Sequence, residues 1–234
     1  MNNVLITGAN RGIGLQLVKH YCQTYQSQGQ IYATFRDEHQ QLLECSKSYP
    51  NLTLIRLDVA NVESIAKLQR SMTGISLNVL INNAGVYGDS SHQFGQTNQQ
   101  HLDTWHHTFA INTIAPLLIT EALIKNLQFS ESAKVAFITS KMGSIADNQS
   151  GGSYIYRSSK AALNAVIKSL SVDLQPLNIS VAAIHPGWVR TRMGGPNGLI
   201  DVETSVNGIS QVITELTPNN SGQFFNYDGQ AIAW

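Results

Sequence analysis

Tyr156 and Lys160 are the residues of this sequence whose types and spacing point most directly to chemistry. They are four residues apart in a segment with a helical pattern, so their side chains lie on the same face of the helix. Free tyrosine has a pKa of about 10, and a neighbouring ammonium group lowers this pKa by stabilising the phenolate. The pair therefore predicts a tyrosine that donates a proton in one direction of a reaction and accepts it in the other. Such pairs also occur by chance, so an exposed helical pair is the alternative interpretation.

Ser140 follows an apolar run and is predicted to lie at the carboxyl end of a strand. A hydroxyl group at that place can hydrogen-bond a substrate oxygen on which negative charge develops. Tyr154 is the nearest competitor of Tyr156, but its spacing places it off the helical face of Lys160. We therefore expect Tyr154 to line a pocket at most, and Tyr156 to exchange the proton.

A glycine-rich turn spans residues 7–14, between the first apolar run and a helical pattern over residues 15–25. Glycines at such a turn let backbone amides approach a pyrophosphate, which the amino terminus of the helix attracts. The spacing G-x-x-x-G-x-G differs from the G-x-G-x-x-G pattern of many dinucleotide-binding turns. A tight turn without a ligand is therefore the alternative for this motif alone.

The second apolar run ends at Phe35 and is followed by Arg36. A site for NAD would need an acidic residue there to bind the ribose hydroxyls, and a phenyl ring accepts no such hydrogen bond. Arg36 and Arg11 could instead bind a 2′-phosphate through charge-assisted hydrogen bonds. We therefore predict NADP(H) as the cofactor. The alternative is a solvated Arg36 that pairs with Asp37 or Glu38.

Seven short apolar runs alternate with helical patterns from one end of the chain to the other. They span residues 4–7, 31–35, 52–57, 78–82, 134–139, 179–184 and 223–225. This alternation predicts a parallel sheet with helices on both faces, and the continuous apolar character predicts strands buried on both faces. We expect an α/β fold of the doubly wound (Rossmann) type, with strand order 3-2-1-4-5-6-7. The length of 234 residues fits a single domain over residues 1–234.

Taken together, the motifs resemble the short-chain dehydrogenase/reductase family, and the resemblance covers essentially the whole chain. The matching residues are Thr7, Gly8, Gly12 and Gly14 of the turn, Leu57-Asp58-Val59, Asn82-Asn83-Ala84-Gly85, and Ser140, Tyr156 and Lys160. The resemblance implies that Asp58 accepts a hydrogen bond from the adenine amino group and that Asn82 braces the central sheet.

Asn112 matches an asparagine that, in this family, holds a water-linked proton relay to the lysine. An asparagine in an apolar helix can also hydrogen-bond buried backbone, for example at a kink near Pro116, and this is the alternative. The loop after the sixth run matches the family's Pro-Gly turn over the nicotinamide, with Thr191 next to the carboxamide. Arg192 departs from the pattern, because an acidic residue is expected at its place.

The predicted catalytic residues are Asn112, Ser140, Tyr156 and Lys160. The predicted cofactor contacts are Gly8, Asn10, Arg11, Gly12, Ile13, Gly14, Arg36, Asp58, Val59, Asn83, Ala84, Gly85, Tyr156, Lys160, Pro186, Gly187, Val189 and Thr191.

More narrowly, residues 142–145, 151–157 and 226–230 are similar to the branch of C-factor-like and sniffer-type carbonyl reductases. This implies an NADP(H)-dependent enzyme that interconverts a small-molecule carbonyl compound and its alcohol. A regulatory protein that binds the nucleotide with little turnover is the alternative. An epimerase or dehydratase is less favoured, because the region after Thr191 leaves little room for a substrate domain.

Composition limits the expected partners. Charged residues make up 13% of the chain, and basic and acidic residues balance at 15 each. This balance favours neither nucleic acid nor anionic lipid as a partner. No apolar run reaches the roughly 18 residues of a membrane span, and the first residues do not resemble a signal peptide, so we expect a cytoplasmic protein. The apolar helical segments 112–127 and 161–174 make a homodimer possible.

Histidine and cysteine give no metal site. His101, His106 and His107 lack the spacing with which two histidines on one helix face bind zinc. Cys22 and Cys45 have neither zinc-site nor redox-motif spacing, so we predict reduced packing residues.

Overall fold

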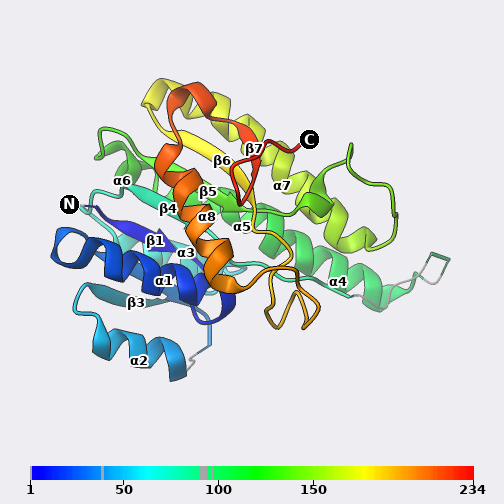
Figure 1. Cartoon of the computed structure of the whole chain (residues 1–234), viewed down its shortest axis with the longest axis horizontal. Coiled ribbons are helices and arrows are strands. Elements are labelled where there is room, and N and C mark those ends of the chain that lie inside the picture. The colour runs from blue at the N-terminus through cyan, green and yellow to red at the C-terminus, as the bar shows by residue number, and fades with distance from the viewer. Residues whose placement is uncertain (1, 38–39, 90–93, 96) are drawn as a thin grey trace.

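The computed structural model describes residues 2–37, 40–89, 94–95 and 97–234. Within them, seven parallel strands form one sheet in the order β3-β2-β1-β4-β5-β6-β7, as predicted (Figure 1). The strands are β1 (Val4–Ile6), β2 (Ile31–Phe35), β3 (Leu52–Arg56), β4 (Val79–Asn82), β5 (Lys134–Ile138), β6 (Ser180–His185) and β7 (Gln223–Asn226). Each end lies within one residue of its prediction, because the apolar runs coincide with the buried strands.

Helices cover both faces of the sheet. One face packs against α1 (Gly12–Tyr25), α2 (Gln40–Ser48) and α8 (Val202–Glu215). The other packs against α3 (Val62–Ser71), α5 (Ala115–Ala122), α6 (Ile124–Gln128) and α7 (Tyr154–Asp173). Successive strand residues face opposite sides, so Val4 and Ile6 belong to the first core and Leu5 to the second. This doubly covered sheet confirms the predicted fold class.

All strands run in the same direction, so their carboxyl ends lie along one edge of the sheet. Ile6, the last residue of β1, pairs with Ala33 of β2 and with Ile81 of β4. The turns that follow these three strands therefore begin at nearly the same level. In sheets of this kind, the ligand binds at the carboxyl edge, where the strand order reverses beside β1.

The helical segment between β4 and β5 is interrupted. Helix α4 (Gln99–Phe109) continues into a π-helical turn, Ala110–Ile114, before α5 begins. The irregular turn precedes Pro116, which lies in the first turn of α5, where a missing backbone N–H costs little. Single π-helical turns often mark functional sites, and Asn112 lies in this one.

Both cysteines are free and buried in the core on the α1 and α2 side of the sheet. This agrees with the predicted packing role. Among the described residues, no helix is long and apolar enough to pass through a membrane.

Candidate active site

The glycine-rich turn brings three segments into close contact. Gly8 has a φ of +64°, and a Cβ atom at this position would lie 2.8 Å from the Cα of Ala84. A Cβ atom on Gly14 would meet the carbonyl oxygen of Gly8 and lie 2.6 Å from Asn83 Nδ2. Glycine is therefore required at both places. The packing joins the β1 turn, the start of α1 and the segment that follows β4.

Thr7 and Asn83 hold this junction together. The Thr7 hydroxyl accepts hydrogen bonds from the backbone N–H groups of Asn83 and Ala84, each at 3.0 Å. The Asn83 side chain donates to the carbonyl oxygens of Thr7 and Gly8 at 2.9 and 3.0 Å. Asn82, which the resemblance implies braces the central sheet, ends β4 and donates to Thr120 of α5 at 3.2 Å. The side-chain hydrogen bonds between the β1 turn and the segment after β4 come from Thr7 and Asn83.

Helix α1 begins with open backbone amides. Arg11 is its N-cap residue, with no side-chain cap hydrogen bond and no acidic residue in the first turn. Side chains cap α3, α4 and α8 through Asn61, Asn98 and Asp201, whereas α7 begins without a side-chain cap, as α1 does. The first N–H groups of a helix need an acceptor, and a phosphate group at this end is favoured by the helix dipole. This end of α1 therefore fits a pyrophosphate.

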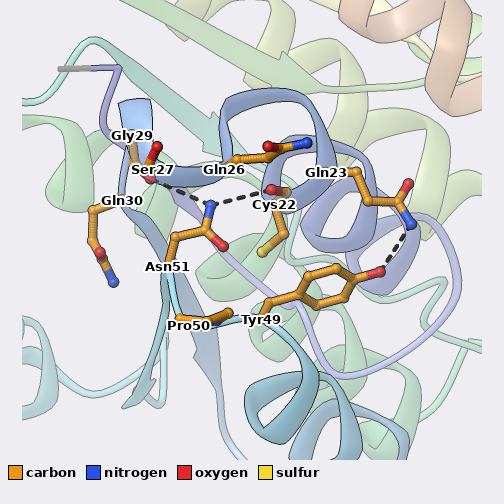
Figure 2. A pocket seen from close by; sticks show the side chains of 9 residues that line it. All are labelled: Cys22, Gln23, Gln26, Ser27, Gly29, Gln30, Tyr49, Pro50 and Asn51. Carbon is orange, nitrogen blue, oxygen red and sulfur yellow. Dashed lines mark hydrogen bonds between the residues drawn. The ribbon is translucent and has the colours of Figure 1, made fainter.

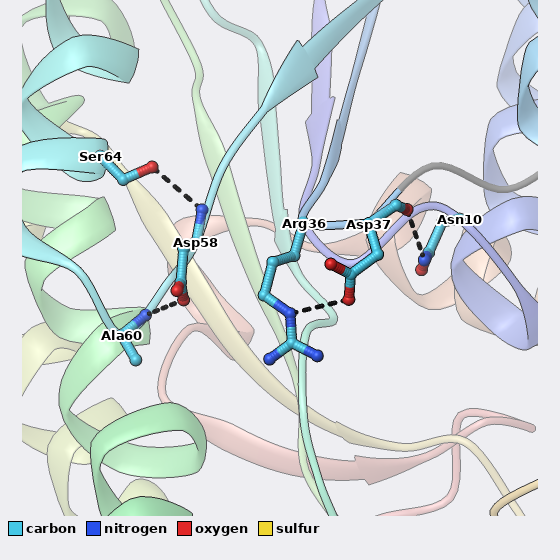
Figure 3. Close-up of polar contacts among 6 residues, drawn as sticks. All are labelled: Asn10, Arg36, Asp37, Asp58, Ala60 and Ser64. Carbon is cyan, nitrogen blue, oxygen red and sulfur yellow. Dashed lines mark hydrogen bonds and ion pairs between the residues drawn. The ribbon is translucent and has the colours of Figure 1, made fainter.

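Positive charge gathers beside the turn. Arg36 Nε lies 2.9 Å from a carboxylate oxygen of Asp37, with side chains 59% and 68% exposed, which is the pairing given above as the alternative (Figure 3). An exposed ion pair of this kind contributes little to stability. It uses Nε of Arg36, so the two terminal guanidinium nitrogens take no part in it. Burial and the nearby charges of Arg192 and Arg36 lower the pKa of Arg11. Three arginines beside one aspartate fit a phosphate group.

Asn10 and Asp58 lie on either side of Arg36 in Figure 3. The Asn10 side chain donates to the carbonyl oxygen of Asp37 at 3.2 Å and so ties the turn to the end of β2. The Asp58 carboxylate accepts the N–H of Ala60 at 3.0 Å, and the Asp58 N–H donates to Ser64 at 3.0 Å. Asp58 is thereby fixed at the start of α3. Its neighbour Val59 packs against the core.

The loop after β6 is held by contacts with Ile200 and with helix α8. Gly187 has a φ of +84°, and a Cβ atom there would lie 2.6 Å from Ile200 Cδ1. The carbonyl oxygen of Pro186 accepts a hydrogen bond from Ser205 of α8 at 2.6 Å, and Val189 forms a bridge with Ile200. These contacts fix the course of the loop beside β6.

The same loop reaches the glycine-rich turn. A Cβ atom placed on Gly12 would lie 3.6 Å from Thr191 Cγ2. The Thr191 hydroxyl accepts the N–H of Gly194 at 3.0 Å. Gly12 and Thr191 thus lie close together, although they belong to separate motifs near opposite ends of the sequence.

Lys160 and Tyr156 lie on α7 with both side chains buried, 4% and 8% exposed. Lys160 Nζ is 5.9 Å from the centre of the Tyr156 ring, and it donates to the carbonyl oxygen of Ile138 at 3.0 Å. Ile138 ends β5. Burial lowers the pKa of Lys160 to about 8, because the charged form loses its hydration. The predicted pair is therefore brought together at the carboxyl edge.

The direction of the Tyr156 pKa differs from the prediction. Burial raises this pKa to about 12, opposed by a hydrogen bond with Ser140 and supported by the neighbouring Tyr87. The rise is opposite to the lowering predicted from Lys160, because the buried phenolate loses its hydration and Lys160 is not among the groups that shift this pKa. At neutral pH Tyr156 keeps its proton and is suited to donate it.

Asn112 fastens the segment after β4. Its side-chain oxygen accepts the N–H of Val86 at 2.9 Å, and its amide donates to the Val86 carbonyl oxygen at 2.8 Å and to Ser159 at 3.0 Å. This is the buried-backbone role given above as the alternative. A Cβ atom on Gly85 would lie 3.3 Å from Asn112 Oδ1 and 3.7 Å from Lys160 Nζ. Asn112 and Lys160 thus both border Gly85.

Two neighbours of the Tyr156–Lys160 pair were not predicted from the sequence. The Tyr87 ring stacks on the Tyr156 ring, with centroids 4.5 Å apart and planes 23° from parallel. Ser159 accepts the Asn112 hydrogen bond and donates to the Tyr156 carbonyl oxygen at 2.8 Å. Tyr87 lies two residues after Gly85 but belongs to no motif, so no pattern of residues indicated it. Ser159 lies beside Lys160 and could have been found from that position alone.

Two cavities lie at opposite ends of the sheet. One, of about 470 Å³, is lined by residues that follow β5, β6 and β7, including Lys141, Trp188 and Leu199. The other, of about 560 Å³, lies beside the end of α1 and the starts of β2 and β3, and Figure 2 shows its lining side chains. Only the first is at the carboxyl edge. Trp188 therefore lines a cavity, whereas Trp234 stacks on Phe224 with centroids 5.4 Å apart.

A parallel sheet that brings a phosphate-binding turn and a buried tyrosine–lysine pair to one edge is typical of nucleotide-dependent oxidoreductases. The chain belongs to the short-chain dehydrogenase family, whose family model matches residues 2–198. This confirms the resemblance found in the sequence.

Individual relatives are also similar. The C-signal protein of Myxococcus xanthus is 43% identical over 158 residues, which cover 68% of this chain and 93% of that protein. The structure of an NADPH-bound carbonyl reductase from chicken fatty liver has a TM-score of 0.90 and 35% identity, covering 100% of this chain and 99% of that one. The carbonyl reductase Sniffer of D. melanogaster has a TM-score of 0.89 and 36% identity, with full coverage of both chains.

Proposed function

We propose that Tyr156 is the general acid and base of an NADP(H)-dependent carbonyl reductase. In this function the chain interconverts a small carbonyl compound and its alcohol. The observation that carries the proposal is the buried Tyr156, next to Lys160 at the carboxyl edge and near enough to the Ser140 hydroxyl for Ser140 to oppose the rise of its pKa. The NADPH-bound chicken carbonyl reductase, a structure similar over the whole chain, supports the choice of cofactor.

The residues around the glycine-rich turn suit the two ends of the nucleotide. The open amides of α1 receive the pyrophosphate, and Arg11 and Arg36 bind the 2′-phosphate. Asp58 would accept a hydrogen bond from the adenine amino group, and the loop of Pro186, Gly187, Val189 and Thr191 would hold the nicotinamide. The bound NADPH supplies the hydride for the carbonyl carbon.

The proton step belongs to the side chains of this chain. Tyr156 donates its proton to the carbonyl oxygen, and the Ser140 hydroxyl hydrogen-bonds the same oxygen as negative charge develops on it. Lys160 stabilises the phenolate that remains. In the reverse direction the phenolate takes the proton back from the alcohol. Asn112 holds the segment after β4 beside Lys160.

The first test measures NADPH oxidation by the purified chain with small aldehydes, ketones and quinones, and repeats it with NADH. Tyr156→Phe keeps the ring and removes only the proton donor, and Tyr154→Phe is the matched control on the same helix. We expect turnover that prefers NADPH, that Tyr156→Phe lowers by a factor of about 100 or more, and that Tyr154→Phe leaves unchanged. Nucleotide binding without turnover would favour the regulatory alternative. Failure to bind either nucleotide would refute the proposal.

We also propose that the chain forms a homodimer through α5, α7 and the residues next to them. Ile114, Phe129 and Val172 are large apolar residues that the chain leaves exposed in this region, and low charge favours such an interface. Light scattering after size-exclusion chromatography should give twice the chain mass. A monomeric mass at micromolar concentration would contradict this.

A cytoplasmic location completes the proposed function. Both cysteines are free and buried, as expected in a reducing compartment. Fractionation of the source cells, with antibody detection of the chain, should recover it with the cytoplasmic proteins. Recovery mainly from the extracellular fraction would contradict this location.

A further inference from the structure

Tyr87 covers one side of the catalytic tyrosine. Its ring lies 4.5 Å from the Tyr156 ring, centre to centre, and 23° from parallel, a geometry in which two aromatic rings attract each other. The Tyr87 hydroxyl lies 3.0 Å from the Ser153 hydroxyl. Ser153 directly precedes α7, which carries Tyr156. Tyr87 therefore contacts both the catalytic ring and the residue before its helix.

The backbone on both sides of Tyr87 is fixed. Before it, both polar groups of Val86 are hydrogen-bonded to the side chain of Asn112. After it, Gly88 has a φ of +80°, and a Cβ atom there would lie 2.9 Å from Thr108 Oγ1 and 3.1 Å from Ile155 Cγ2. The segment thus has little space on either side. These contacts hold the backbone on both sides of Tyr87, so its ring can keep a constant position against the Tyr156 ring.

We propose that Tyr87 is a positioning residue for the proton transfer: its ring holds the Tyr156 ring in place and keeps water from one face of it. The inference rests on the proposed function, in which Tyr156 is the proton donor. The proposal also gives Asn112 an indirect role, because Asn112 holds the backbone of Val86, the residue before Tyr87.

The same contact opposes the ionisation of Tyr156. Tyr156 is faced by two titratable groups in the described structure, Lys160 on its own helix and Tyr87 from the segment after β4. Burial raises the pKa of Tyr156 to about 12. A ring that excludes water makes the phenolate harder to form. Removing the ring should therefore make the proton easier to lose.

The test compares Tyr87→Leu, which removes the ring, with Tyr87→Phe, which keeps the ring and removes the hydroxyl. Tyr49→Leu, at the opposite end of the sheet, is the matched control for the same change. For each variant one measures kcat and KM for carbonyl reduction, the pH profile of alcohol oxidation, the melting temperature, and the Kd for NADPH by fluorescence.

For Tyr87→Leu we expect kcat to fall about three- to tenfold, the range that an aromatic stack can supply, with Kd for NADPH within about twofold of the wild type. In the pH profile of alcohol oxidation, the rise in rate should move to lower pH by about half a unit or more, because the phenolate of Tyr156 becomes easier to form. Tyr87→Phe should restore most of kcat and the original pH profile. Tyr49→Leu should change neither.

Three results would overturn the inference. The first is a Tyr87→Leu variant with unchanged kcat and pH profile, whatever its melting temperature. The second is a Tyr87→Phe variant as impaired as Tyr87→Leu, because then the ring is not what matters. The third is a Tyr87→Leu variant that loses kcat while its pH profile of alcohol oxidation stays unchanged. If Tyr87→Leu does not fold, Tyr87→Met fills the space without a ring and takes its place. The proposed function fails separately, through a wild type without Tyr156-dependent turnover.

Discussion

Replacing Lys160 with methionine should separate the stability of the chain from its activity. The Lys160 side chain is 4% exposed, and burial lowers its pKa to about 8, whereas an unfolded lysine titrates at about 10.4. One pKa unit corresponds to about 1.4 kcal/mol. The buried ammonium group therefore lowers the free energy of unfolding by about 3 kcal/mol at pH 7.

The pH dependence follows from these two pKa values. Below pH 8 the lysine is charged in both the folded and the unfolded chain, and the full cost is present. As pH rises above the pKa of about 8, the folded chain loses this proton first, so the unfolded chain binds more protons and the stability rises. By pH 9.5 about half of the cost has disappeared, and above the unfolded pKa none remains.

Lys160→Met keeps the length of the side chain and removes the charge, but it also removes the hydrogen bond to Ile138, worth about 1 kcal/mol. We expect the variant to be more stable than the wild type by about 2 kcal/mol at pH 7 and nearly equal at pH 9.5, while reductase activity is lost. Urea unfolding at both pH values and NADPH oxidation measure this. Lys125→Met, at an exposed position on α6, is the control and should show no change with pH.

The reasoning is refuted if Lys160→Met is less stable than the wild type at pH 7. It is also refuted if the difference in stability between the two proteins is the same at pH 7 and pH 9.5, because burial of the charge would then not be the cause.

The remaining predictions concern the nucleotide site. Arg36→Ala should weaken NADPH binding about tenfold or more and leave NADH binding unchanged; calorimetry with both nucleotides measures this, and an unchanged preference would contradict the 2′-phosphate role. Arg192→Asp should weaken NADPH binding about tenfold, because a carboxylate beside Arg11 would replace a cation, and the effect should shrink in high salt. Gly14→Ala should abolish nucleotide binding and lower the melting temperature, since its Cβ atom would meet the Gly8 carbonyl oxygen; a variant that melts like the wild type would argue against this close packing.

The sheet was accessible to prediction because each strand is a continuous apolar run bounded by polar or turn residues. The Tyr156–Lys160 pair and the glycine-rich turn were equally accessible, since their members are close in sequence. The stacking of Tyr87 on Tyr156 and the π-helical turn around Asn112 were not. Both depend on packing between segments that lie far apart in the chain.

The sign of the Tyr156 pKa was missed for a related physical reason. The sequence places a lysine on the same helical face as the tyrosine, but it does not show how deeply either is buried. In the structure Lys160 lies near the ring of Tyr156 and bonds to Ile138. Desolvation, which depends on the whole surrounding structure, is therefore the largest cause of the pKa shift of each group.

The uncapped start of α1 should make the stability of the folded protein depend on the concentration of its nucleotide. A phosphate at this end would satisfy amides that the side chains of α1 leave open, so the nucleotide would serve as the cap of the helix. A ligand at 100 times its Kd stabilises a fold by about 2.7 kcal/mol. When NADP(H) is scarce, the first βα unit should exchange its amide hydrogens sooner and be cleaved sooner by proteases, so that the amount of enzyme follows the amount of its cofactor.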